Sequence, residues 1–317
     1  MKICVLAYYV ISKLDDPAKV IKEQKKVLEA LNSAGRIYVS HEGVNAQLSL
    51  VEDDVLVYLD FLKQDPYYAT ADVKIHTWHE HPFAKLTIKE RPQLCAIDTE
   101  VDFSNRGDHI SPEEFAARIE QKDAATIVID VRNNYESEVG YFEGAIKPDL
   151  ESFREFPAFA KELSQKFDPA KTTVLMYCTG GIRCEYYSPL LKKEGFNKVY
   201  QLNGGVIRYG MEQGNRLWHG KLFVFDDRLV VDIAELKNSD IAHCHFCKCD
   251  TSTYYNCANM DCNALFLSCQ ACALKHKGCC CETCLIEGRV RVFDDRQQPR
   301  PFRKLAHEEK IKLNQGL

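Results

Sequence analysis

The first 92 residues alternate between the two-residue period of a strand and the 3.6-residue period of a helix. The pattern predicts strands at 3–11, 36–40, 45–50, 73–80 and 85–89, and helices at 17–34 and 51–64. Pro17 begins the first helix, and we expect Gly35 to end it. The order β-α-β-β-α-β predicts a ferredoxin-like (acylphosphatase-like) α+β domain over residues 1–92.

A second pattern, strands alternating with helices, follows a connector and entry helix at 93–121. Ser111 is placed to cap that helix, with proline next and glutamate three positions after the cap. Strands are predicted at 125–132, 172–177 and 198–202, and helices at 153–167, from Arg183 onward and after Gly204-Gly205. This alternation predicts a parallel α/β domain over 122–216, with its chemistry at the carboxyl ends of the strands.

The remaining residues, 217–317, lose this regularity. A β-rich bridge at 217–240 leads into a cysteine block, and a polar tail runs from 288 to 317. Counting Glu287, the tail holds eight positive and five negative residues. A solvated tail is the first interpretation, and an arm that contacts tRNA is the second.

Composition narrows the class of protein. The chain has 317 residues, 45% hydrophobic and 27% charged, which is typical of a globular protein of two or three domains. No apolar run approaches the roughly 20 residues of a membrane helix, and the short apolar start predicts a strand and not a signal peptide. The net charge of −5 argues against a chain that is basic throughout, so RNA contacts would come from a local patch.

Cysteine is the most informative residue type. Of the 15 cysteines, 11 follow residue 243. An odd total and clustered short spacings indicate metal binding in a reducing cytoplasm, and not a secreted disulfide framework.

The spacing of these cysteines predicts two tetrahedral zinc sites, because a C-x2-C turn supplies two thiolates at once. We expect a crossed arrangement, with one site formed by Cys244, Cys247, Cys269 and Cys272 and the other by Cys257, Cys262, Cys280 and Cys284. Cys279 is an alternative to Cys280, and Cys249, Cys281 and His276 are further alternates. Four protein thiolates leave no open position, so both ions are expected to be structural, and an iron–sulfur cluster is the rival interpretation.

The chemical centre of the sequence is a strand that stops at Cys178. The apolar run 174–176 predicts a buried strand, and Gly180 and Gly181 predict a tight loop before a helix that includes Arg183. Backbone N–H groups, a helix N-terminus and a guanidinium would all favour the thiolate form of Cys178. The alternative is a core cysteine at a strand end.

Two other groups of polar residues are weaker candidates. The first comprises His41, Glu42 and Asn45, for which turn chemistry is favoured over substrate contact. The second comprises His76, Trp78, His79 and His81, which predict a strand end and loop more than a metal site.

The Cys178 loop resembles the rhodanese family. Four residues separate Cys178 from Arg183, whereas a cysteine phosphatase loop has five and cradles a phosphate. The shorter loop suits a smaller group on sulfur, such as a persulfide. The stretches Asp130–Glu136 and Gly140–Ala145 resemble the D-x-R-x-x-x-E and G-H-I-x-G-A signature of rhodaneses, with tyrosine at 141 in place of histidine.

The whole chain resembles the bacterial rhodanese-domain tRNA uridine hydroxylases. The matching stretches are 40–47, 130–145, 177–185, 195–199, 203–205 and 256–263. The resemblance implies oxygen-dependent hydroxylation at C5 of the wobble uridine, position 34 of tRNA, with molecular oxygen as co-substrate. This step begins the route to 5-methoxy- and 5-oxyacetate-type uridines.

Two other classes of function compete with this hypothesis. A sulfurtransferase would need only the loop, a persulfide on Cys178 and a thiol acceptor. A non-enzymatic zinc module would use the rhodanese domain as a scaffold, which the intact Cys178 and Arg183 argue against.

Roles within the loop follow from residue type. Cys178 is the expected reactive thiolate, and Arg183 with the loop amides would stabilise it. The polar residues Asp130, Arg132 and Glu136 are expected to brace the loop, and direct participation in the reaction is the alternative. Cys184 is either a resolving thiol or a packing residue. No flavin, haem or mononuclear-iron motif is visible, so the sequence identifies no electron donor, and zinc has no redox chemistry.

Overall fold

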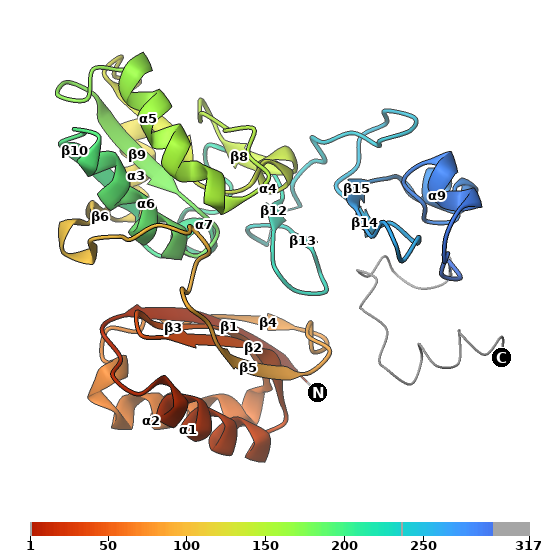
Figure 1. Ribbon diagram of the computed structural model, residues 1–317, viewed down its shortest axis with the longest axis horizontal. Coiled ribbons are helices and arrows are strands. Elements are labelled where there is room, and N and C mark those ends of the chain that lie inside the picture. Colours follow the sequence, from red (N-terminus) through yellow and green to blue (C-terminus); the bar gives the residue numbers. More distant parts are fainter. Residues whose placement is uncertain (1, 236, 294–317) are drawn as a thin grey trace.

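The computed structural model describes residues 2–235 and 237–293. Figure 1 shows three parts that follow one another along the chain: an N-terminal α+β domain, a central α/β domain and a smaller cysteine-rich part. Most of the polar tail that we predicted, with its alternative role as a tRNA-contacting arm, lies outside the described residues.

The N-terminal domain is a five-stranded sheet with two helices. Its elements are β1 (Ile3–Ile11), α1 (Pro17–Ala30), β2 (Ser33–Ser40), β3 (Gly43–Val51), α2 (Val55–Gln64), β4 (Lys74–Trp78) and β5 (Leu86–Glu90). The strand order β4-β1-β3-β2-β5 is that of a ferredoxin-like sheet with β5 added in parallel beside β2. The predicted α+β architecture is therefore confirmed.

The two faces of this sheet have different partners. One set of alternating residues, including Leu6, Ile37 and Leu48, packs into a core with Leu28 of α1 and Tyr58 of α2. The other set faces away from these helices, because successive strand residues point to opposite faces. Figure 1 shows α1 and α2 on the far side of the sheet and the open face turned toward the central domain.

The prediction that Gly35 ends the first helix is wrong. The helix ends at Ala30, and Gly35 lies inside β2, where it pairs with Leu48 of β3. A Cβ atom on Gly35 would lie 2.5 Å from the Leu48 Cα atom, so close approach of two strands requires glycine here. A glycine that follows a helical pattern of apolar residues can either end the helix or lie inside the next strand, and the local sequence looks the same in the two situations.

The central domain is built around a four-stranded parallel sheet in the order β6-β10-β9-β7. Its elements are β6 (Asp108–Ile110), α3 (Pro112–Glu120), β7 (Thr126–Asp130), α4 (Asn134–Glu138), β8 (Gly140–Phe142), α5 (Phe156–Lys166), β9 (Thr173–Tyr177), α6 (Ile182–Lys193), β10 (Lys198–Leu202) and α7 (Gly205–Gln213). Ser111 caps α3, since its Oγ accepts a hydrogen bond from the Glu114 N–H at 3.1 Å.

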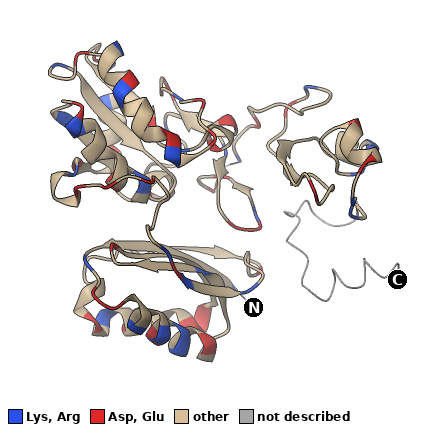
Figure 2. Ribbon diagram, in the orientation of Figure 1, with Lys and Arg blue, Asp and Glu red and all other residues tan. Residues whose placement is uncertain are grey.

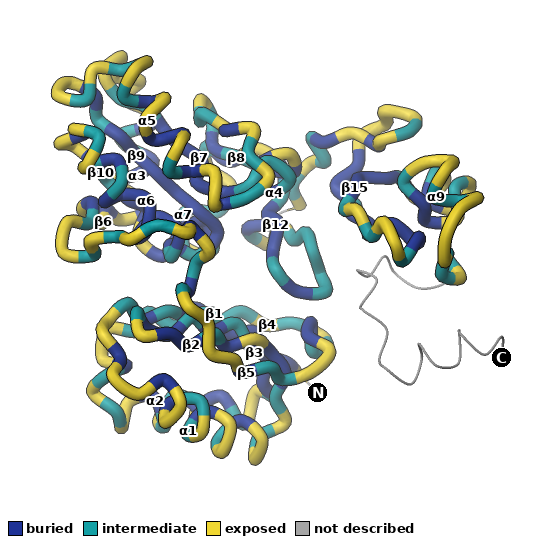
Figure 3. Tube along the Cα trace, viewed as in Figure 1, coloured by how far each residue is buried: buried dark blue, intermediate teal, exposed yellow. Residues whose placement is uncertain are grey.

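Helices cover both faces of this sheet, as the alternation predicts. One core contains side chains of α5 and α6, and the other contains side chains of α3 and α7. The central strand β9 is buried along most of its length (Figure 3). Its carboxyl end therefore delivers Cys178 to a rigid position.

The cysteine-rich part has short elements: β11 (Trp218–Gly220), β12 (Leu222–Phe223), β13 (Val230–Val231), β14 (Tyr254–Asn256), β15 (Leu265–Leu267), α8 (Gln270–Lys275) and α9 (Glu282–Ile286). Strand β11 pairs with β8 and so ties this part to the central domain. None of the helices within the described residues combines the length and apolar character needed to cross a bilayer.

Candidate active site and cysteine clusters

Cys178 lies where β9 ends and the loop to α6 begins. The Gly181 N–H donates a hydrogen bond to the Cys178 Sγ atom at 3.1 Å. Gly181 has a φ of 104°, a backbone conformation that glycine adopts readily and other residues avoid. The loop can therefore turn its amide toward the sulfur, as the glycine pair predicts.

The surroundings of Cys178 stabilise its thiolate. Burial, the largest single influence, raises the pKa of the thiol. A hydrogen bond from the Cys184 thiol, the charge of Arg183 and the backbone N–H groups of Arg183 and Gly181 outweigh burial and lower the pKa of Cys178 to about 6. At neutral pH the sulfur is therefore mostly ionised and nucleophilic.

Arg183 is held by a carboxylate that is distant in sequence. Its two terminal nitrogens donate to the Glu136 carboxylate at 2.5 and 2.7 Å, and Glu136 is fully buried. Thr179, next to Cys178, also donates to Glu136, at 3.2 Å. A bidentate pair of this kind fixes the loop on α4 and offsets part of the guanidinium charge. Arg183 thus supports the loop as well as the thiolate.

A second buried ion pair, Arg132 with Asp130, supports the same loop region. Arg132 donates to both oxygens of Asp130, and both side chains are fully buried. Arg132 also donates to the Gly140 carbonyl at 2.6 Å, and the Tyr177 hydroxyl donates to Asp130 at 2.8 Å. These contacts join β7, β8 and β9 behind the loop, which is the bracing arrangement that we expected of Asp130 and Arg132.

A cavity of about 380 Å³ opens between the N-terminal and central domains. Cys178 and Arg183 line its central-domain side, and Asn45 and Lys74 on the open face of the N-terminal sheet line the other. A volume of this order is typical of a small-molecule or single-nucleotide pocket. Cys178 therefore faces a space that neither domain forms alone.

The N-terminal sheet also contacts the loop directly. Lys74 is buried, and its Nζ donates to the Gly180 carbonyl at 3.3 Å and lies 3.2 Å from Asp72. Burial lowers the pKa of Lys74, and the nearby Asp72 carboxylate opposes this effect. Tyr9 donates to Glu185 of α6 at 2.9 Å. Sequence reasoning missed both residues, because only docking of the two domains brings them to the loop.

Two further cysteines lie near Cys178. Cys184 is fully buried in the core formed by α5 and α6, and burial, with its contact to Cys178, raises its pKa well above the usual range. Cys95, from the connector, lines the same cavity. Burial is also the main cause of the raised pKa of Cys95. Cys184 and Cys95 therefore remain protonated thiols at neutral pH, next to the ionised sulfur of Cys178.

The two weaker groups of candidates are dispersed. Glu42 accepts from Tyr186 of α6 at 2.5 Å, and His41 contacts the Leu14 carbonyl. Among the histidines, His76 contacts Arg228 and His81 contacts the Ser49 hydroxyl. His76 and His81 therefore have separate hydrogen-bond partners, and the metal-ligating groups found among the described residues include none of these histidines. Only Asn45 from either group lines the cavity.

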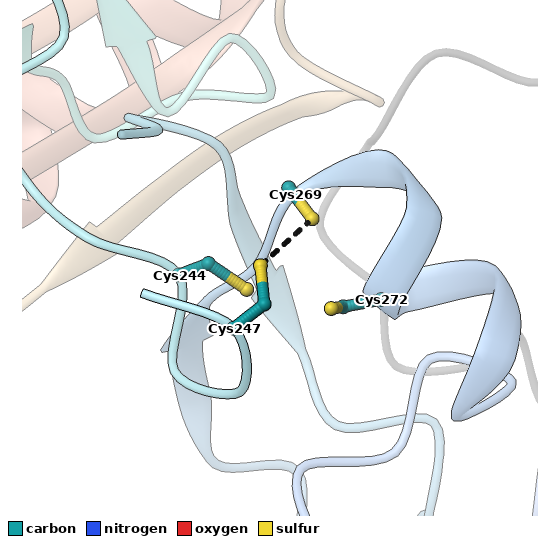
Figure 4. A group of neighbouring side chains, drawn as sticks. All are labelled: Cys244, Cys247, Cys269 and Cys272. Atoms are coloured by element: carbon teal, nitrogen blue, oxygen red, sulfur yellow. Dashed lines mark hydrogen bonds between the residues drawn. The ribbon is translucent and has the colours of Figure 1, made fainter. Parts of the chain in front are cut away.

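The cysteine block forms two groups of four sulfurs. Cys244, Cys247, Cys269 and Cys272 make one group, with all sulfur atoms within 4.8 Å of one another. Figure 4 shows their side chains converging from the turn at 244–247 and the start of α8. The Sγ atoms of Cys247 and Cys269 are 3.7 Å apart.

The second group consists of Cys257, Cys262, Cys280 and Cys284, again within 4.8 Å of one another. The alternates lie outside both sets: Cys279 is buried with its Sγ 3.5 Å from the Cys284 carbonyl, whereas Cys249 and Cys281 are exposed. Both groups of four match the crossed arrangement and could hold metal ions. Thiolate ligands of this number and proximity are compatible with zinc.

Charge on the surface is mixed. Figure 2 shows basic and acidic residues interspersed along α1 and α2, with no helix of a single sign there. The net charge of −5 agrees with this picture. Positive charge near the cavity is local, and comes from residues such as Arg36, Lys74 and Arg154.

A parallel sheet with a thiolate at the end of its central strand, a short glycine loop and a following helix define a rhodanese-like enzyme. Family models support each part: a UPF0176 acylphosphatase like domain matches residues 3–94, a rhodanese-like domain matches 111–211, and a rhodanase C-terminal domain matches 219–285.

Curated relatives match nearly the whole chain. A tRNA uridine(34) hydroxylase of Chlamydia trachomatis is 47% identical over 301 residues, which cover 94% of this chain and 91% of the relative. The protein of the same name from Protochlamydia amoebophila is 47% identical over 303 residues, 96% of this chain and 94% of that one. The chain therefore belongs to the tRNA uridine(34) hydroxylase family.

Solved structures match only part of the chain. The rhodanese-like domain of an Anabaena protein is 19% identical, covers 35% of this chain and 78% of its own, and has a TM-score of 0.30. This similarity carries no argument about function.

Proposed function

We propose that this protein hydroxylates C5 of uridine 34 in tRNA, with Cys178 as the reactive thiolate and molecular oxygen as co-substrate. The main support for this proposal is that Cys178, with its lowered pKa, lines an interdomain cavity in a chain that is 47% identical to proteins named for this reaction. A tRNA substrate and a reducing interior also fit a cytoplasmic location.

The cavity suits chemistry on a single base. The target nucleotide would leave the anticodon loop stack and enter between the domains, at a cost of a few kcal/mol. Cys178 would then add through sulfur to C6 of the uracil ring. The π electrons of C5–C6 move toward O4, and C5 becomes the electron-rich carbon that reacts with oxygen.

The atoms and electrons balance with an external reductant. Uridine, O2, two electrons and two protons give 5-hydroxyuridine and water, and the Cys178 thiolate is released unchanged. A reductant of the thiol class would supply the electrons, since two thiols give one disulfide, two electrons and two protons. The second oxygen atom leaves as that water.

The two cysteine groups would hold structural zinc. Each closed set of four thiolates leaves no position for water or substrate, so neither ion would act on the base. The ions would instead stabilise the cysteine-rich part, whose core contains few apolar residues.

The test is mass spectrometry of tRNA nucleosides from a strain that lacks this gene and has no other hydroxylation route. Expression of the wild-type chain should restore 5-hydroxyuridine or its derivatives at position 34, and Cys178→Ser should not. Restoration by Cys178→Ser would overturn the role of the thiolate. No restoration by the wild type would overturn the proposed function.

Sulfur transfer is the competing outcome, because the Gly181 N–H on the Cys178 sulfur would equally suit a persulfide. An RNA stem-loop with 5-fluorouridine at position 34 separates the two. Addition at C6 should trap a covalent complex on Cys178, whereas rapid transfer of sulfur from thiosulfate to cyanide without trapping would favour a sulfurtransferase.

A further inference from the structure

The cavity wall opposite Cys178 is an ordered array of side chains on the open face of the N-terminal sheet. In one row across the strands, Tyr9 of β1 pairs with Asn45 of β3, which pairs with Tyr38 of β2. All three line the cavity. Aromatic rings thus flank an amide in the first row.

The second row lies two residues further along each strand. Ala7 of β1 pairs with Lys74 of β4 and with Gln47 of β3, and Gln47 pairs with Arg36 of β2. These four residues also line the cavity. Cations therefore stand at both ends of a row with a second amide and a small alanine between them.

The side-chain amides of Asn45 and Gln47 make no hydrogen bonds that hold the described fold together. Among the described residues, neither the Asn45 nor the Gln47 side chain has a hydrogen-bond partner. Both are half-buried. By contrast Tyr9 and Lys74, their neighbours on the wall, are already engaged with Glu185 and Gly180. Half-buried amides without partners on a cavity wall are available to a ligand.

Uracil fits this array by its chemistry. Its edge carries an N–H donor at N3 between two carbonyl acceptors, and a side-chain amide offers both an acceptor and donors. Aromatic rings accept the flat face of an unstacked base. The guanidinium of Arg36, which is exposed at one end of the second row, would lie toward the flanking phosphates.

We propose that the open face of the N-terminal sheet binds the target base, and that Asn45 and Gln47 read the uracil edge. This inference rests on the proposed function, since it takes a uridine in RNA as the ligand. It assigns base selection to the ferredoxin-like domain and leaves bond-making to the central domain. Asn45 and Gln47 are then the specificity-determining residues.

The test compares two anticodon stem-loop RNAs, identical except for uridine or cytidine at position 34. Their dissociation constants are measured by fluorescence anisotropy for the full chain and for Asn45→Ala and Gln47→Ala. Asn32→Ala and Gln64→Ala are matched controls, because these two residues are exposed and do not line the cavity.

Each cavity variant should weaken binding of the uridine RNA about tenfold, which is the loss of one well-made hydrogen bond, and change cytidine RNA binding much less. The controls should bind as wild type does. The pH profile of Cys178 alkylation should be unchanged in the cavity variants, which separates lost recognition from a disturbed loop.

Two results would overturn the inference: equal binding of the two RNAs by the wild type, or both cavity variants within twofold of wild type on the uridine RNA. Either result leaves the hydroxylation assay of the proposed function untouched. Failure of that assay in the wild type would instead remove the proposed function itself.

Discussion

The Cys178 loop and the cysteine-rich part both concentrate sulfur, but their surroundings differ. Cys178 has a large apolar core behind it and receives hydrogen bonds from Gly181 and Cys184. The clustered cysteines stand beside a small core and face one another in sets of four. A single thiolate that the protein stabilises by itself stays free to react. Four thiolates held together repel one another and require a cation, and once they bind it they are no longer free nucleophiles.

Removing a ligand from the clusters should have the largest effect. Cys269→Ser should lower bound zinc from two ions per chain to one and unfold the part around β14, β15 and α8. Structural zinc contributes on the order of 10 kcal/mol to folding of small domains. Elemental analysis and protease sensitivity measure both changes.

Cys249→Ser is the control that tests the ligand assignment, because Cys249 is exposed and lies outside both sets of four, although its sulfur is 3.4 Å from the Cys247 sulfur. It should keep two ions. Loss of an ion in Cys249→Ser and retention in Cys269→Ser would mean that the ligand sets are different from those the geometry brings together.

Breaking the ion pair behind the loop should have the next largest effect. Arg183→Met leaves the Glu136 carboxylate buried without its partner and should cost about 3–5 kcal/mol of stability. Chemical denaturation measures the loss. Arg118→Met, which breaks the more exposed pair with Glu114 on α3, should cost less than about 1 kcal/mol. Equal losses would show that Arg183 does not brace the loop.

The ion pair of Arg183 also illustrates which features of the site can be predicted from the sequence and which cannot. Cys178 at a strand end and the closely spaced cysteine pairs follow from local spacing, so the sequence predicts them, but local spacing leaves open whether Cys279 or Cys280 joins the second group. The partner of Arg183 is 47 residues away, and the wall residues Lys74, Asn45 and Gln47 come from another domain. Their approach depends on packing between domains, which no local period encodes. The prediction for Gly35 is wrong for a related reason, because glycine is found both where two strands approach closely and where a helix ends.

The pH dependence of alkylation should separate the two kinds of cysteine. The thiolate fraction of Cys178 rises with pH through its pKa of about 6, so its reaction with iodoacetamide should be nearly constant above pH 7. Below pH 6 the rate should fall about tenfold per pH unit. Mass spectrometry of the peptide that contains Cys178 measures the rate.

Cys184→Ala removes a hydrogen bond that lowers the pKa of Cys178, so the midpoint of this profile should move upward. A midpoint near the ordinary value of about 8.5 in the wild type would contradict a thiolate stabilised by the loop.

The contact between the domains should give the smallest effect. Tyr9→Phe removes the hydrogen bond to Glu185 and leaves the ring in place, so it should cost about 1 kcal/mol. Thermal unfolding measures this loss, and Tyr67→Phe, at an exposed hydrogen bond to the Ser12 carbonyl, is the control. A loss above about 3 kcal/mol would mean that this hydroxyl is part of a larger network.

The open face of the N-terminal sheet covers Cys178, and this cover affects how readily the sulfur is oxidised. A sulfur ionised at neutral pH is readily driven by peroxide to sulfenic acid and on to sulfinic and sulfonic acids, the last two of which no ordinary reductant reverses. With only 1% of Cys178 exposed, peroxide must enter through the interdomain opening. A tRNA anticodon lodged in that opening would close it, so the enzyme would be least vulnerable to inactivation while it is working.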